Sequence, residues 1–143
     1  MTKWMLATLN FIQIAMFRLF GRRMRVQGRP LLLLTTTGAK TGRRRETTLG
    51  WFPDEERGGG SRLIVASNAG AATHPSWYVN LARRPDGAAI EVDGRQFAMN
   101  AESLDGAERD RAWKRIAALA PGYGKYEQQT DREIPVVRLI PKT

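Results

Sequence analysis

Apolar side chains dominate the first helix-length segment of the chain, and their spacing changes at Pro30. Residues 3–20 (KWMLATLNFIQIAMFRLF) place apolar side chains around most of the circumference of a helix that ends among basic residues. Two charged and two amide side chains interrupt the segment, so it lacks the run of about 20 apolar residues that a membrane-spanning helix needs. We expect an interfacial helix over residues 3–20. It packs on its own domain or on a second subunit, or it contacts an anionic membrane surface, which suits its arginines.

Beyond Pro30, short apolar runs and alternating positions are typical of strands. Four leucines followed by three threonines predict a strand that is buried on both faces at its start. The pair Asp93-Gly94 predicts a hairpin turn between two alternating segments. The expected strands cover residues 31–37, 45–52, 61–67, 88–92, 97–101 and 134–140.

Two further helices are expected outside the strands. Pro75 suits the first position of a helix that ends near Pro85. Asp105 and Glu108 resemble a capping box, which would open a helix reaching to about Ala120.

These elements predict a mainly β (α+β) fold. About six antiparallel strands joined by short hairpins, with helices outside, are typical of a small barrel. Residues 53–60 and 121–126 are expected to be loops, the first a charged turn without a chemical role. We expect residues 1–29 to form the amphipathic helix and a basic linker. Residues 30–143 are then one cofactor-binding barrel domain.

The composition excludes several kinds of chemistry. The 143 residues include no cysteine and a single histidine, His74. Disulfides, thiolate zinc sites, cysteine-ligated iron–sulfur clusters and a cysteine nucleophile are therefore excluded, and no metal site is expected. Redox chemistry would have to come from a bound organic cofactor.

Positive charge is concentrated in the first third of the chain. Residues 1–45 hold ten basic groups and no acidic one, whereas the other 98 residues hold 13 basic and 14 acidic groups. Arginine outnumbers lysine 18 to 5, which favours bidentate recognition of phosphate or carboxylate. Few aromatic residues lie between these arginines, so we expect no nucleic-acid partner.

The segment 35–45 (TTTGAKTGRRR) is the strongest candidate for a binding site. Gly38 and Gly42 permit a tight turn between two strands, and Lys40 and the three following arginines can converge on one anion. A P-loop is rejected because that motif needs glycine at Ala39. A hairpin tip that is merely solvated stays open as the alternative.

Three other patches carry candidate chemistry. Residues 65–71 join a strand end to a loop of small residues, where a planar ring can approach the backbone and Ser67 can hydrogen-bond to it. The helix with Trp77 and Tyr78 fits packing better than cofactor contact. Two late phenols, Tyr123 and Tyr126, can line a substrate pocket or donate a proton. His74, which precedes a helix start, is expected to be a structural capping group.

Three ordered motifs resemble one known family. They are LLLLTTTGAKTGRRRETTLGW, LIVASNAGAATHPSWYVNLARRP and YGKYEQQTDREIPVVRLIP, and together they span residues 30–141. The chain resembles the deazaflavin-dependent nitroreductase family, whose members use coenzyme F420. The resemblance implies a split β-barrel of the FMN-binding kind.

The resemblance also implies which residues bind the coenzyme. Lys40 and Arg45 correspond to the positions that hold its phosphate and oligoglutamate tail. The predicted coenzyme-binding set is Ala39, Lys40, Thr41, Arg45, Thr47, Thr48, Leu49, Gly50, Val65, Ala66, Ser67, Asn68, Ser76, Trp77, Tyr78, Val79, Asn80 and Tyr123. The side chains expected to orient the substrate or relay a proton are Ser67, Tyr123 and Tyr126.

Three positions depart from the best-known nitroreductase of the family. Asn68 stands in place of a lysine, Gly50 in place of an aromatic residue and Ala120 in place of a tyrosine. Coenzyme binding is therefore better supported than activation of nitro drugs.

The leading hypothesis is a reductase that transfers a hydride from reduced F420 to an apolar, electron-poor acceptor such as a quinone, an activated alkene or a nitroaromatic. A non-catalytic F420 carrier and an FMN-dependent enzyme of the same barrel class are the alternatives. We expect a cytoplasmic protein, with peripheral contact to the inner face of the cell membrane and a homodimer both left open.

Overall fold

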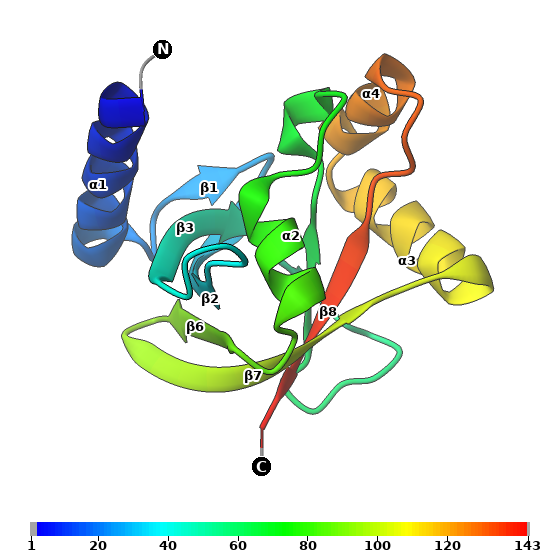
Figure 1. Ribbon diagram of the computed structural model, residues 1–143. Coiled ribbons are helices and arrows are strands. Elements are labelled where there is room, and N and C mark those ends of the chain that lie inside the picture. The colour runs from blue at the N-terminus through cyan, green and yellow to red at the C-terminus, as the bar shows by residue number, and fades with distance from the viewer. Residues whose placement is uncertain (1–2, 143) are drawn as a thin grey trace.

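The computed structural model describes residues 3–142, without the side chains of residues 3 and 6. Figure 1 shows a curved sheet with helices around it. The helices are α1 (Lys3–Phe20), the 3₁₀ turn η1 (Asn68–Gly70), α2 (Ser76–Arg83), α3 (Gly106–Leu119) and α4 (Gly122–Gln129). The strands are β1 (Arg25–Val26), β2 (Arg29–Thr37), β3 (Arg44–Gly50), β4 (Phe52–Pro53), β5 (Arg62–Val65), β6 (Ala88–Val92), β7 (Arg95–Ser103) and β8 (Val136–Pro141).

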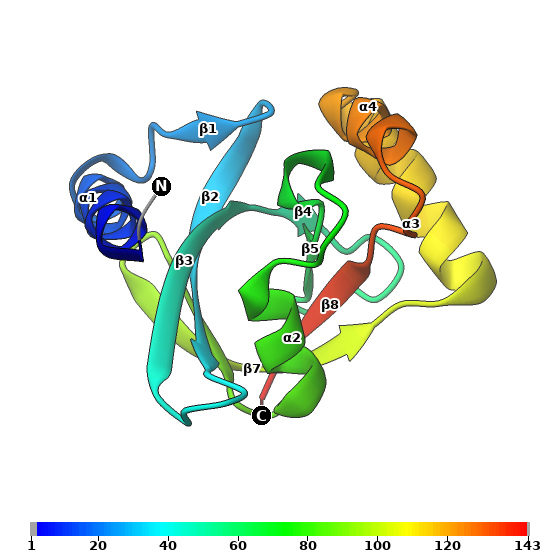
Figure 2. The ribbon, with the colours of Figure 1, turned by 45° about the horizontal axis from the view of Figure 1, so that its top comes forward.

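The strands form one antiparallel sheet that curls around α2 (Figure 2). Its order is β1-β2-β6-β7-β8-β5-β4, and β3 pairs with β2 outside this path. The described residues thus form eight strands, not about six, because β1 and β4 are two-residue strands that the sequence pattern does not reveal. The expected antiparallel barrel with flanking helices is confirmed.

Strand β2 is buried on both faces because two different layers cover it. Leu32 and Leu34 point into the core enclosed by the sheet, together with Trp77 of α2. Leu31 and Leu33 point to the other side, where Phe17 of α1 packs on them. This explains why the strand appears in the sequence as a continuous apolar run rather than as alternation.

A second core lies under α3 and α4. Trp113 and Ile116 of α3 and Tyr123 of α4 pack against Phe52 and the outward-facing side chains of β5 and β8. The two strands therefore also carry apolar residues on both faces.

The helix expected over residues 3–20 is confirmed as α1, and it packs on its own domain. Phe17 is buried and Ile14 partly buried against β2, but much of the helix surface faces outward. Trp4, Phe11 and Leu19 are each more than 70% exposed. Within residues 3–142, no helix has both the length and the apolar character needed to cross a bilayer.

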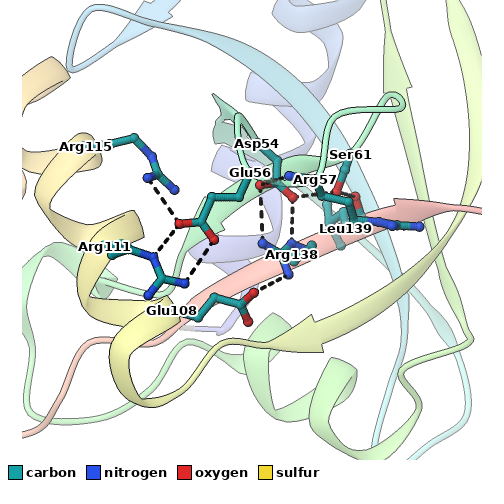
Figure 3. A network of polar contacts seen from close by, with 9 residues as sticks. All are labelled: Asp54, Glu56, Arg57, Ser61, Glu108, Arg111, Arg115, Arg138 and Leu139. Atoms are coloured by element: carbon teal, nitrogen blue, oxygen red, sulfur yellow. Dashed lines mark hydrogen bonds and ion pairs between the residues drawn. The ribbon is translucent and has the colours of Figure 1, made fainter.

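The turn over residues 53–60, expected to have no chemical role, instead supplies a buried charge. Asp54 is 4% exposed, and its Oδ2 accepts hydrogen bonds from Arg138 Nε at 2.6 Å and from Ser61 Oγ at 2.9 Å. Arg138 of β8 is itself buried, and its Nη1 donates to Glu108 at 3.1 Å (Figure 3). The turn is thereby tied to β8 and α3.

Three further local expectations were wrong. Residues 122–126 lie within α4 rather than in a loop, and Pro121 is the N-cap of that helix. Helix α3 begins after Asp105 as expected, but neither half of the capping box forms, because Glu108 turns to Arg138 instead. Pro75 lies just before α2, one residue outside the first helical position.

Replacing Arg138 with methionine would leave the Asp54 carboxylate buried without its charged partner. We expect the free energy of unfolding to fall by about 3–5 kcal/mol, as for other buried pairs that lose one member. Urea denaturation at pH 7 measures this change. The matched control is Arg111→Met, which removes an exposed ion pair with Glu56 and should barely move the midpoint. Equal midpoints for the two variants would contradict the assignment.

The stability should also depend on pH through Asp54. Burial raises the pKa of this carboxyl, but the hydrogen bonds from Arg138, Ser61 and the Arg57 amide outweigh burial and bring it below its ordinary value of 3.8. A lowered pKa means that the stabilisation is complete above pH 3.8 and is lost as the pH falls through the folded-state value. We expect Asp54→Asn, although less stable at pH 7, to lose less stability between pH 5 and about 2.5. If the urea midpoints of the wild type and Asp54→Asn fell in parallel across that range, Asp54 would not be the source of the pH dependence.

Candidate functional site

Two cavities between β3 and α2 share part of their lining, and together they are called the groove below. One, the hairpin cavity, has a volume of about 830 Å³ and lies beside the β2–β3 turn. The other, the tyrosine cavity, has a volume of about 530 Å³ and reaches α4. Thr47, Ser76 and Trp77 line both cavities and join them.

The hairpin cavity brings together the residues expected to bind an anion. Its lining comprises Ala7, Asn10, Thr36, Gly38, Ala39, Lys40, Thr41, Arg45, Glu46, Thr47, Ser76, Trp77, Val79 and Asn80. Lys40 and Arg45 are exposed, and among the described residues neither forms an ion pair with a carboxylate. Their charge is therefore available to a ligand.

Asn80 of α2 fixes the shape of this hairpin. Its Oδ1 accepts a hydrogen bond from the Ala39 amide at 2.9 Å, and its Nδ2 donates to Thr36 Oγ1 at 3.1 Å. The turn itself closes through Gly42, whose φ of 70° lies in the left-handed region that favours glycine. The predicted binding residue Asn80 is thus engaged in holding the hairpin, with its side chain 7% exposed.

Helix α1 forms a wall of the hairpin cavity that sequence reasoning missed. Ala7 and Asn10 line the cavity, and Asn10 Nδ2 donates to the Glu46 carbonyl of β3 at 2.9 Å. A single asparagine in an apolar segment gave no signal of this contact.

The tyrosine cavity is lined along one side by β3. Its lining comprises Val26, Gln27, Thr47, Thr48, Leu49, Gly50, Val65, Ser67, Asn68, Ala69, His74, Pro75, Ser76, Trp77, Tyr123 and Tyr126. Among the described residues β3 pairs with β2 alone, so the backbone groups on its other edge are free to bond a planar ligand.

The two tyrosines differ in their environment. Tyr123 is buried edge-to-face against Phe52, and burial raises the pKa of its phenol, so it stays protonated at neutral pH. Tyr126 is partly exposed and accepts a hydrogen bond from Gln27 Nε2 at 3.0 Å, which leaves its own proton free to be donated. Gln27 was missed by sequence reasoning, because a residue in the β1–β2 turn gives no sign of facing α4.

The remaining predicted residues fall into two groups. Val65, Ser67 and Asn68 line the tyrosine cavity as expected of a ring-binding loop, and Asn68 Nδ2 also bonds the Thr73 carbonyl at 3.1 Å. Ala66 and Tyr78 line neither cavity. Ala66 is fully buried, and the Tyr78 hydroxyl lies 3.3 Å from Ser103 Oγ.

His74 does not cap a helix, contrary to expectation. Pro75 occupies the N-cap position of α2, and His74 lies among the residues that line the tyrosine cavity. Its ring packs 4.9 Å from that of Tyr78.

This arrangement suits an elongated ligand with an anionic end. Lys40 and Arg45 would hold the anion, the open edge of β3 would hold a flat ring, and Trp77 connects the two regions. Ser67, Tyr123 and Tyr126 place three hydroxyls where a second, reacting molecule can be bound.

Comparisons with known proteins show the family of the chain. A family model described as F420H(2)-dependent quinone reductase matches residues 12–141. A protein of Mycobacterium tuberculosis with that same name is 40% identical over 119 residues, which cover 80% of this chain and 76% of the relative.

Solved structures give the same result. An F420-H2 dependent reductase, FDR-A, superposes with a TM-score of 0.67 at 36% identity, covering 78% of this chain and 94% of that one. A chain described as a domain-swapped dimer has a TM-score of 0.68 at 30% identity, covering 92% and 98%. A pyridoxamine 5'-phosphate oxidase-like protein of Listeria innocua, at 12% identity and a TM-score of 0.52, shares the fold and covers 94% of each chain. The predicted resemblance and the split-barrel fold are both confirmed: this chain belongs to the F420H(2)-dependent quinone reductase family.

Proposed function

We propose that the chain binds reduced F420 in the groove and uses it to reduce a quinone-type acceptor. The observation that carries this proposal is the pair of cavities with a shared lining, with Lys40 and Arg45 in one and Ser67, Tyr123 and Tyr126 in the other. The coenzyme, when bound, supplies the hydride. The groove has to hold it, exclude water from its ring and admit the acceptor.

Lys40 and Arg45 are proposed to bind the phosphate and the acidic tail of the coenzyme. Both lie on the rigid β2–β3 hairpin, which Asn80 holds in place through Ala39 and Thr36. A guanidinium pairs with phosphate or carboxylate through two parallel hydrogen bonds, which gives orientation as well as affinity.

The acceptor is proposed to lie in the tyrosine cavity. Tyr126 is poised to donate, because its oxygen already accepts a hydrogen bond from Gln27. The buried Tyr123 keeps its proton and closes the cavity from the side of α4. Ser67, in the small-residue loop, lines the same cavity and is the third candidate for orienting the acceptor or relaying a proton.

Arg45→Ala should weaken coenzyme binding by roughly 1.5–3 kcal/mol, or about 10- to 100-fold in Kd, because it removes a charge-assisted bond to the tail. Arg44→Ala is the matched control. The neighbouring side chain points to the other face of β3, where Arg44 pairs with Glu46 and lies outside the groove. Fluorescence titration with F420 and steady-state reduction of menadione by F420H2 measure binding and turnover.

The outcomes of this titration separate three functions. Micromolar binding with turnover of menadione supports the reductase. Tight binding without turnover of any quinone, nitro compound or enone indicates a carrier. FMN binding without F420 binding indicates an FMN enzyme of the same barrel class. Equal Kd values for the wild type and Arg45→Ala would show that Arg45 does not bind the coenzyme and is only a solvated residue of the hairpin.

We also propose that α1 rests on an anionic membrane surface. Trp4, Phe11 and Leu19 are strongly exposed on it, and the first 45 residues hold no acidic group that would repel such a surface. This position would bring the groove wall formed by Ala7 close to a reservoir of apolar quinones. A similar chain is described as a domain-swapped dimer, so the alternative is that a second copy of this chain covers the exposed face of α1.

Flotation with phosphatidylglycerol vesicles tests this placement. We expect the wild type to float and the double variant Trp4→Ser, Phe11→Ser to stay in solution, because apolar burial in the headgroup region is lost. Leu119→Ser, at an exposed apolar residue of α3, is the matched control and should float. The contrary outcome is a wild type that does not float and is a dimer in gel filtration, together with a double variant that is a monomer. The exposed face of α1 would then bind a second copy of the chain rather than a membrane.

A further inference from the structure

Arg132 binds three backbone carbonyls of the small-residue loop and also contacts His74. It lies in the segment between α4 and β8, and its guanidinium donates to the carbonyls of Ser67 at 2.7 Å, Ala71 at 2.9 Å and Ala66 at 3.1 Å. Its Nη1 also lies 3.1 Å from Nδ1 of His74. One side chain thus holds both ends of the loop that lines the tyrosine cavity.

The loop needs such support because its backbone is strained. Asn68 and Ala69 have φ values of 47° and 53°, in the left-handed region that residues with a Cβ rarely adopt. Such a conformation is unfavourable and persists only where the surroundings impose it. The three carbonyl bonds from Arg132 supply that constraint.

The contact with His74 determines where the imidazole carries its proton. A guanidinium has only donors, so Nδ1 of His74 must accept, and the ring proton then lies on Nε2. The two nitrogens are on different sides of the ring, so Nε2–H points away from Arg132. His74 is exposed, but partial desolvation and the charge of Arg132 both lower its pKa, which favours the neutral ring at pH 7.

We infer that Arg132 is a positioning residue that holds His74 as a neutral Nε2–H donor, and that His74 binds a carbonyl oxygen of the acceptor in the tyrosine cavity. His74 lines that cavity together with Tyr123 and Tyr126. The ring of Tyr78 packs on the imidazole, and Arg132 is the charged group of the described residues that contacts it.

The chemical value of such a donor rests on the proposed function. A quinone that accepts a hydride gains two electrons and one proton and becomes a hydroquinone anion. The Nε2–H bond stabilises the negative oxygen as it forms, and the last proton comes from water or a phenol, so His74 keeps its own proton. A neutral imidazole can polarise a carbonyl in this way without placing a second cation beside Arg132.

The single histidine makes the first half of the inference directly measurable. Protein labelled with ¹⁵N-histidine shows the nitrogens of His74 alone. We expect the Nε2–H tautomer at pH 7 and titration below the ordinary value of 6.5. Arg132→Gln should raise the pKa towards that value, whereas Arg111→Gln should not. An Nδ1–H tautomer, or an unchanged pKa in Arg132→Gln, would overturn the positioning role.

Two substitutions test the donor role. His74→Phe keeps a flat ring without a donor, and His74→Gln places an amide nitrogen near the position of Nε2. We expect kcat/KM for menadione to fall about 100-fold in His74→Phe, as for other lost oxyanion donors, and to recover most of that in His74→Gln. The Kd for F420, measured alongside, should stay within about twofold and shows that both variants fold.

The outcomes distinguish this inference from the proposed function. A wild type that reduces menadione while His74→Phe is equally active overturns the donor role alone. A wild type that binds F420 but reduces no quinone overturns the proposed function and with it the donor role, and the tautomer measurement then still decides what Arg132 does.

Discussion

Strand β3 has a strand partner along only one of its edges in the described part of the chain, and the groove depends on that open edge. Backbone groups that no strand satisfies need other partners. Helix α1 supplies one, through Asn10 and the Glu46 carbonyl. The stretch from Thr47 to Gly50 faces the tyrosine cavity, where a flat ligand ring can take the place of the missing strand. The groove therefore lies where the sheet fails to close.

Two arginines on the C-terminal side of α4 hold other segments of the fold together. Arg138 joins β8 to the turn at Asp54 and to α3 through Glu108. Arg132 precedes β8 and holds the small-residue loop in its strained conformation. Arginines thus serve two purposes: Arg45 offers its charge to a ligand at the hairpin cavity, whereas Arg132 and Arg138 use theirs inside the fold.

Local patterns predicted the elements whose burial is regular. The alternation of β6 and β7 and the apolar run of β2 came directly from the sequence, because each follows the period of one backbone conformation. Helix α4 was mistaken for a loop because two glycines lower its helix propensity. Burial of Tyr123 against Phe52 outweighs that propensity, and no local signal reports a partner 71 positions away in the chain.

The sequence by itself indicated the candidate residues for the chemistry, namely the cationic hairpin, the small-residue loop and the two late tyrosines, and it showed the absence of any thiol. Only the tertiary structure decided how they are used. It placed Asn80 under the hairpin, turned Tyr78 away from both cavities and brought Gln27 to Tyr126. It also set His74 against Arg132. Residue type limits what a side chain can donate or accept, whereas the direction in which it does so depends on contacts between segments that are distant in the chain.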